Sequence, residues 1–320
     1  MTIWVHRYEL VPRARLSARA AAGPRYGALL RVDDGFADVH PWPELGDAPL
    51  DEQLSRLARG ETTPLTARSL HFAALDAAAR REGRSLFDGL TIPESHWPAA
   101  AGEAPPAFDT VKVKMPGSDP PSRGRLRLDF NATLDAASFL RVAASLPRER
   151  IDFVEDPCPY DAAVWRELRA QTGLRLALDR EFATEGVDVL VVKPAIQPVP
   201  GEQVAAGGEP NPFSSSLGDV SIVVTSYMDH PVGQLHAAAA ARSATNPRCG
   251  LVTHVLFEPN AFSERLALDG ARLVPPGGRG IGFEDLLEEA DWTRLSQADF
   301  KQVDCMGADE SPRGDSRNRG

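Results

Sequence analysis

Five short apolar runs, each with the character of a buried strand, end in a charged residue, and their spacing strongly constrains the fold. The charged ends are Lys114, Asp129, Glu155, Asp179 and Lys193. The three acids are separated by 26 and 24 residues. Strands that recur about every 25 residues, with helical patterns between several of them, predict β/α units and a parallel sheet. In a closed (β/α)₈ barrel all strands point the same way, so these charged ends are expected to meet at one mouth.

Three carboxylates at one mouth would repel one another and raise each other's pKa unless a cation lies between them. The neighbouring sequence offers no cluster of cysteine or histidine, and ligation by oxygen alone favours Mg²⁺ or Mn²⁺ over zinc. We therefore expect Asp129, Glu155 and Asp179 to bind such an ion. The alternative for each single acid is that it caps a helix or pairs with an arginine.

The run TVKVK places two lysines on one face of its strand. Alternation directs Lys112 and Lys114 to one side and Val111 and Val113 to the other. Lysines that face a barrel interior are costly unless the site uses them, so we interpret both as site residues. A solvent-facing edge strand is the alternative.

The ordered set KVK, DFN, VEDP, LDRE and VVKP resembles the muconate-lactonizing branch of the enolase superfamily, and within it the o-succinylbenzoate synthase family. The likeness extends over nearly the whole chain, from GALLRVDDGFADVHPW to GGRGIGFEDLLEEADW. It implies a modified (β/α) barrel and an α+β capping domain built from the N-terminal and C-terminal segments. We expect the capping domain at 1–95, the barrel at 96–274, a return to the capping domain at 275–305 and a disordered tail at 306–320.

The resemblance also implies a role for each site residue. Lys114 and Lys193 are the expected acid–base pair, and Lys112 and Asn131 are expected to support the metal ligands. Residues expected to hold a small-molecule carboxylate substrate are Arg25 and Tyr26 in a capping loop at 20–27, and Thr225, Ser226 and Tyr227 at a late strand end. His230, just before a helix that starts at Pro231, is interpreted as a helix-entrance residue and not as a second base.

The reaction implied is a dehydration, as in a hydro-lyase of menaquinone biosynthesis. The substrate would be 2-succinyl-6-hydroxy-2,4-cyclohexadiene-1-carboxylate and the product o-succinylbenzoate, reached through an enediolate by syn elimination. An N-acylamino acid racemase or dipeptide epimerase would use the same residues, with both lysines as bases. A binding protein that keeps the barrel without turnover is a third reading, which the intact acids and lysines disfavour.

Two crossovers between the predicted strands are too short for a full helix. The segments 115–125 and 180–192 are short, and the first is rich in proline and glycine, whereas a parallel crossover normally needs a dozen or more residues. We expect an incomplete helical ring. The consequence would be either a lower thermal stability than relatives with a full ring or a monomer with loops packed flat on the barrel.

Composition narrows the class of protein. A net charge of −10 over 320 residues, without a Lys/Arg-rich block, argues against a nucleic-acid partner. The chain has no apolar run long enough to span a membrane. Its three scattered cysteines suit a reducing compartment. We therefore expect a cytoplasmic protein and favour a monomer.

Overall fold

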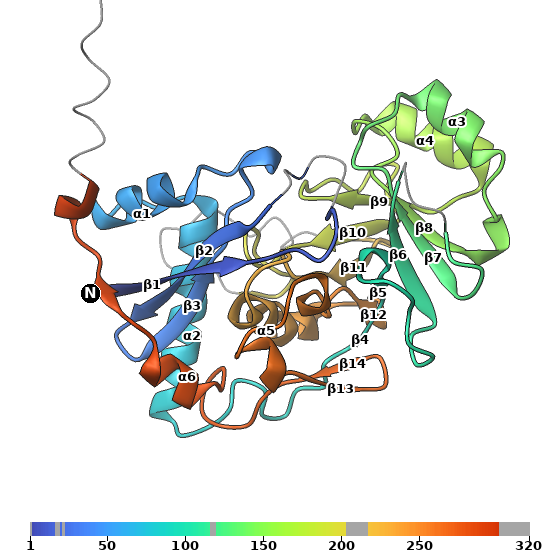
Figure 1. The fold of residues 1–320 in the computed structure, drawn as a ribbon. Coiled ribbons are helices and arrows are strands. Elements are labelled where there is room, and N and C mark those ends of the chain that lie inside the picture. The colour runs from blue at the N-terminus through green and yellow to red at the C-terminus, as the bar shows by residue number, and fades with distance from the viewer. Residues whose placement is uncertain (1, 17–19, 21–22, 116–119, 203–216, 301–320) are drawn as a thin grey trace, which may run out of the picture.

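The computed structural model of the protein describes residues 2–16, 20, 23–115, 120–202 and 217–300. The expected tail at 306–320 lies outside these residues. Figure 1 shows two parts, a smaller sheet covered by helices and a barrel of parallel strands. Within the described residues, no helix combines the length and apolarity needed to cross a bilayer.

The capping domain is built on a four-stranded antiparallel sheet in the order β15-β1-β2-β3. Its strands are β1 (Ile3–Leu10), β2 (Arg25–Val32), β3 (Gly35–Val39) and β15 (Thr293–Arg294). Val32 pairs with Gly35 across a two-residue turn, and Asp33 has a φ of 51°, as the Asp-Asp-Gly hairpin signal predicts. Because β15 pairs with β1, the C-terminal segment completes the N-terminal sheet.

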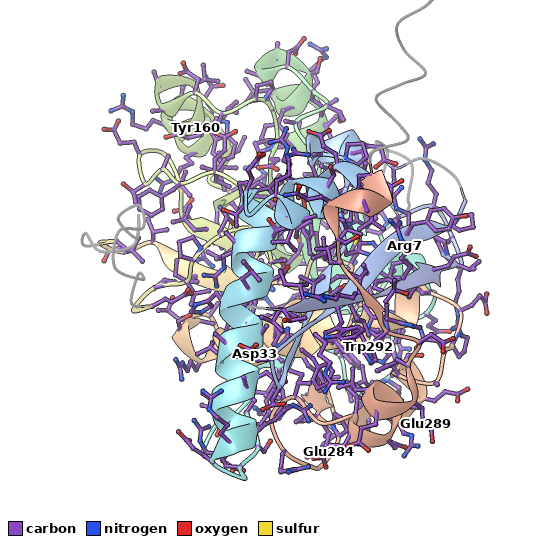
Figure 2. The ribbon with its side chains drawn as sticks, turned by 90° about the vertical axis from the view of Figure 1, so that its left-hand side faces the viewer. Arg7, Asp33, Tyr160, Glu284, Glu289 and Trp292 are labelled. Carbon is purple, nitrogen blue, oxygen red and sulfur yellow. The ribbon has the colours of Figure 1, made fainter. Side chains whose placement is uncertain are left out.

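Helices cover this sheet. They are α1 (Leu50–Ala58) and α2 (Pro64–Arg81), and the short α6 (Glu284–Glu289) precedes β15. Helix α2 begins at Pro64, after a capping box between Thr63 and Thr66, and proline is favoured in the first turn of a helix. Figure 2 is viewed from the side of this domain, with α2 in front. Trp292, labelled there, packs on Phe36 of β3 with ring centroids 5.6 Å apart and joins the C-terminal return to the sheet.

The barrel is a seven-stranded parallel sheet in the order β11-β10-β9-β8-β7-β6-β5. Its strands are β5 (Trp97–Pro98), β6 (Thr110–Lys114), β7 (Arg125–Asp129), β8 (Ile151–Glu155), β9 (Leu176–Asp179), β10 (Val189–Val192) and β11 (Ser221–Val224). Two very short strands close the ring, β4 (Glu94–Ser95) and β12 (Arg248–Cys249). Thr225 bridges Gly250, and β12 pairs in parallel with β4, which leads into β5. A rim hairpin of β13 (Ala267–Asp269) and β14 (Arg272–Val274) adds to β4.

Alternation along these strands sorts side chains between the interior and the outer wall. A small apolar cluster forms from Phe153, Ala177, Val189, Val191 and Val223. Phe153, Ala177, Val189 and Val191 each lie two or four residues before the charged end of their own strand. Alternate residues of a strand point to the same side, so these side chains and the charged ends both face the interior. The intervening residues, such as Leu126, Leu178 and Leu190, belong to the larger core beneath the helices.

Helices cover only part of the outer wall. They are α3 (Ala136–Ala143), α4 (Ala162–Thr172) and α5 (Pro231–Ala240). Across both parts of the molecule, short 3₁₀ turns lie at Pro43–Leu45, Ala99–Ala101, Arg148–Arg150, Ala241–Ser243, His254–Leu256, Ser263–Arg265 and Gln297–Phe300. No helix occurs among the described residues of the two short crossovers, 120–124 and 180–188. The predicted barrel with an incomplete helical ring is therefore confirmed.

The wall is nevertheless buried where a helix is missing. Leu190 and Val192 on the outer face of β10 are each 1% exposed, and they belong to one core cluster with Val187 and Val199 of the adjoining loops. Apolar loop residues thus replace helix packing here, which agrees with loops packed flat on the barrel. Thermal stability relative to full-ring proteins stays a prediction.

Two buried carboxylates meet where the capping domain packs on α5. Asp38 of β3 accepts hydrogen bonds from the Tyr8 hydroxyl at 2.6 Å and from the His230 backbone N–H at 3.1 Å. A Cβ on Gly233 would lie 2.6 Å from oxygens of both Asp38 and Asp229, so the two carboxyl groups approach each other across this glycine. Burial raises the pKa of Asp229 to about 7, and burial plus repulsion from Asp229 raises the pKa of Asp38 well above its usual range.

This pair predicts a pH-dependent stability. The folded pKa of Asp229 exceeds its unfolded value, so its contribution is fully present below about pH 4 and is lost as the pH rises through about 7. Asp229→Asn should remove a penalty of up to about 4 kcal/mol at pH 8 and change little near pH 4. Chemical denaturation of both proteins across this range measures the difference. A variant whose loss of stability between pH 5 and 8 matches that of the parent would contradict the assignment.

Candidate active site

The register of the parallel strands brings the charged strand ends together. Lys114 pairs with Asp129, and Asp129 pairs with Glu155, so three strands end at the same level. Asp179 lies level with Val191, two residues before Lys193. The order β6, β7, β8, β9, β10 places the two lysines four strands apart. In a ring closed by β4 and β12 this puts them on opposite sides of the mouth, with the three acids between them.

Each carboxylate contacts a lysine. The Lys112 ammonium donates to both oxygens of Glu155, at 2.6 and 2.7 Å, and lies 3.0 Å from Asp129. Lys114 donates to Asp129, and Lys193 donates to Asp179. Asn131, with a φ of 51°, turns its backbone N–H back onto Asp129 at 2.9 Å.

These contacts are buried, and burial shifts the pKa values of the groups that form them. Asp129 is 0% and Glu155 1% exposed. Burial, then repulsion from Asp129, raises the pKa of Glu155 to about 7 in spite of Lys112. For Asp129, burial would raise the pKa, but Lys112 and Lys114 outweigh it and hold the pKa well below its usual range. Burial would lower the pKa of Lys112, yet the surrounding carboxylates raise it.

The donor set fits a hard divalent cation. Asp156 joins the three acids, and burial followed by repulsion from Asp179 raises its pKa well above its usual range. Burial and mutual repulsion thus disfavour the charged forms of Glu155 and Asp156, and a cation among these carboxyl groups would offset that repulsion. Among the described residues, no three side chains converge on one point as they do around a bound ion. The lysine ammonium groups instead occupy the carboxylate oxygens.

A cavity of about 680 Å³ opens over these residues. Lys112, Lys114, Asn131, Asp179 and Lys193 line it, while Asp129 and Glu155 lie beneath the lysines. Arg15 and Leu16 of the capping domain close one side. The volume suits a small organic acid.

Arg25 and Tyr26 do not line this cavity, which corrects their predicted role in substrate contact. Strand β2 begins at Arg25, so both residues belong to the sheet and not to a loop over the mouth. Arg25 forms a bidentate ion pair with Glu44 at 2.6 and 2.8 Å and stacks on Trp42, and Tyr26 is 58% exposed. Residues 21–22 of the predicted loop lie outside the described residues.

The predicted residues after β11 divide into two groups. Thr225 and Ser226 line the cavity, but Tyr227 does not. The Tyr227 hydroxyl donates to Asp47 at 2.8 Å and accepts from Arg180 at 2.8 Å, and its carbonyl accepts from the Trp42 indole at 2.8 Å. Tyr227 therefore joins the barrel to the capping domain through Asp47 and Trp42.

His230 caps the first turn of α5 and is buried outside the cavity. Its ring nitrogen accepts from the Val232 backbone N–H at 3.2 Å. This confirms the interpretation as a helix-entrance residue.

Sequence reasoning missed several polar residues that line the cavity, among them His96, Asp156 and Arg180. Asp156 directly follows Glu155, and it accepts a hydrogen bond from the Asp179 backbone N–H at 3.1 Å. Its position beside a predicted ligand was an available signal. His96 lies in a proline-rich and alanine-rich stretch with no visible strand periodicity, so no local pattern could have identified it.

Comparisons with known proteins agree with this geometry. Residues 3–79 match the family model "O-succinylbenzoate synthase, N-terminal domain". The o-succinylbenzoate synthase of Bdellovibrio bacteriovorus is 36% identical over 331 residues, covering 90% of this chain and 97% of the relative.

Solved structures share the fold at low identity. The dipeptide epimerase of Enterococcus faecalis, solved with Mg and a dipeptide, has a TM-score of 0.68 at 14% identity, covering 88% of this chain and 98% of its own. The muconate lactonizing enzyme of Pseudomonas fluorescens has a TM-score of 0.66 at 16% identity, covering 88% and 95%. At this identity the likeness shows the barrel and capping architecture alone. The near full-length relative, the matching N-terminal domain and the shared architecture show that this chain belongs to the o-succinylbenzoate synthase family of the enolase superfamily.

Proposed function

We propose that the protein dehydrates 2-succinyl-6-hydroxy-2,4-cyclohexadiene-1-carboxylate to o-succinylbenzoate by syn elimination, as part of menaquinone biosynthesis. The observation that carries the proposal is the placement of Lys114 and Lys193 on opposite sides of a cavity, flanking buried carboxylates. A substrate whose carboxylate faces the acids would lie between the two lysine side chains. Family membership supplies the choice of substrate.

Lys114, in its neutral amine form, takes the proton from the carbon that bears the carboxylate and becomes an ammonium. Its Nζ contacts Asp129 at the strand end and faces the cavity, so it can reach a substrate atom above the acids. The same ammonium then returns the proton to the departing hydroxide, because a syn elimination uses one face. A positioned general base contributes about 10²–10⁴-fold.

Lys193 acts from the opposite face as a fixed positive charge. Its ammonium is positioned by an ion pair with Asp179. A cation over the face of a conjugated ring stabilises the developing dianion electrostatically.

Asp129, Glu155 and Asp179 are the residues that would hold Mg²⁺ or Mn²⁺, with Lys112 and Asn131 orienting their carboxylates. The ion would offset charge on the substrate carboxylate as the enediolate forms. Thr225 and Ser226 border the opposite wall, where backbone and hydroxyl groups can orient the substrate. We also propose a monomeric, cytoplasmic enzyme, and the buried, unpaired Cys158 and Cys249 are consistent with a reducing compartment.

The test is turnover by the purified protein supplied with Mg²⁺. Loss of the ultraviolet absorbance of the cyclohexadiene, with appearance of o-succinylbenzoate, is the expected result. In parallel, N-succinyl amino acids are incubated with the protein in deuterated water. Efficient deuterium entry at the α-carbon, with the cyclohexadiene left unchanged, would instead identify a racemase.

A further inference from the structure

His96 is a buried histidine in the cavity wall to which the mechanism above assigns no task. It lies between β4 and β5 and is 6% exposed, and it lines the cavity. Its backbone N–H donates to the Cys249 carbonyl at 2.9 Å, which anchors it where β4 and β12 close the barrel. His96 therefore faces the cavity from the side of the ring that lies away from Glu155.

Arg127 determines which nitrogen of the His96 ring carries the proton. The Arg127 guanidinium lies 3.0 Å from His96 Nδ1. A guanidinium offers only N–H donors and stays charged, so Nδ1 must present its lone pair. The proton of the neutral ring is then on Nε2.

This arrangement is rigid and keeps the ring neutral. Arg127 is 0% exposed and is held by Asp152 at 2.9 Å, by the Arg248 carbonyl at 3.1 Å and by Asn246 at 3.1 Å. Burial, followed by the charge of Arg127, holds the pKa of His96 well below its usual range. His96 therefore presents an uncharged N–H donor near neutral pH.

That donor has room beside it and no partner among the described residues. A Cβ on Gly250 would lie 3.0 Å from His96 Nε2 and 2.7 Å from Thr225 Cγ2, so only glycine leaves this corner of the cavity open. The hydroxyl of the neighbouring Thr225 is buried without a hydrogen-bond partner in the part of the chain described. The His96 Nε2 and the Thr225 methyl group thus flank one glycine on the same wall.

We propose that His96 contacts the substrate and donates a hydrogen bond from Nε2 to an oxygen of its carboxylate, next to Thr225. The inference rests on the proposed dehydration. A carboxylate directed at the acids of β7, β8 and β9 has its remaining oxygen free toward the opposite wall. A neutral donor there binds the oxygen more strongly as the enediolate gains charge, and it adds no cation that would compete with the metal site.

The alternative is that His96 serves only as an acceptor for Arg127. His96→Gln can offer a carbonyl to Arg127 and an N–H to the cavity, whereas His96→Leu offers neither. We expect His96→Leu to lower kcat by about 10–100-fold with KM changed much less, and His96→Gln to recover most of that loss. His6→Gln, a half-buried histidine on β1 of the capping domain, is the matched control and should leave kcat unchanged. Equal kcat values for the parent, His96→Gln and His96→Leu would overturn the proposal.

A measurement that needs no turnover keeps the inference separate from the proposed reaction. In protein labelled with ¹⁵N-histidine, the His96 resonances are assigned by their loss in His96→Gln. We expect a protonated Nε2 and an unprotonated Nδ1, and a shift of Nε2 when o-succinylbenzoate binds. Protonation on Nδ1, or an Nε2 resonance unmoved at saturating product, would overturn it even if His96→Leu proves unstable. Absence of dehydration by the parent protein would instead refute the proposed function, because the tautomer is read without the reaction.

Discussion

Replacing Lys114 by alanine is expected to remove dehydration, with a loss of at least about 10⁴-fold in kcat. The loss exceeds that for an ordinary general base because the same Nζ takes the proton and returns it to the leaving hydroxide. The fold should survive, since Asp129 keeps Lys112 at 3.0 Å as a charged partner. Turnover of the cyclohexadiene and thermal unfolding of parent and variant measure the two effects.

Lys193→Arg is the informative comparison. Arginine keeps the positive charge beside Asp179 but cannot act as a base. If Lys193 acts only as a fixed charge, this variant should retain measurable dehydration. A Lys193→Arg protein as inactive as Lys114→Ala, with its structure intact, would show that both lysines transfer protons, as a racemase requires.

Removal of the divalent ion, or of the central acid, is the second change with a large expected effect. Exhaustive chelation should abolish turnover, and Mg²⁺ or Mn²⁺ should restore it. Glu155→Gln should lower turnover by at least about 10³-fold, because the amide has no charge with which to bind the ion or balance Lys112. Isothermal titration with Mg²⁺ should show weaker binding in the same variant.

The Glu155 variant should still fold. Its carboxyl already has a pKa raised to about 7, so the neutral amide suits the buried site, and Lys112 keeps Asp129 as a partner. Glu258→Gln, on the exposed surface near Arg13, is the matched control and should not change turnover. Full activity after exhaustive chelation would rule out the metal-assisted mechanism.

Most of the barrel could be predicted from the sequence, because residues alternate between the two faces of each strand. Period-two patterns assign Lys112 and Lys114 to the interior and Val111 and Val113 to the wall, and the short crossovers exclude full helices by length alone. Such features are local, so they survive without knowledge of distant contacts. The residues missed or misplaced depend on partners far away in sequence. Arg25 was expected over the mouth, but Glu44 and Trp42 hold it in the sheet.

By itself, the sequence determined the strand ends that carry the lysines and acids, because each is the last inward position of an apolar run. Only the tertiary structure decided what surrounds them. The strands that close the ring, β4 and β12, are two residues long and have no period to recognise. Their pairing is what brings His96 beside Gly250, and the fold of the barrel interior is what sets Arg127 against its ring. A histidine's tautomer depends on the group that its ring faces, and that neighbour exists only once the barrel has closed.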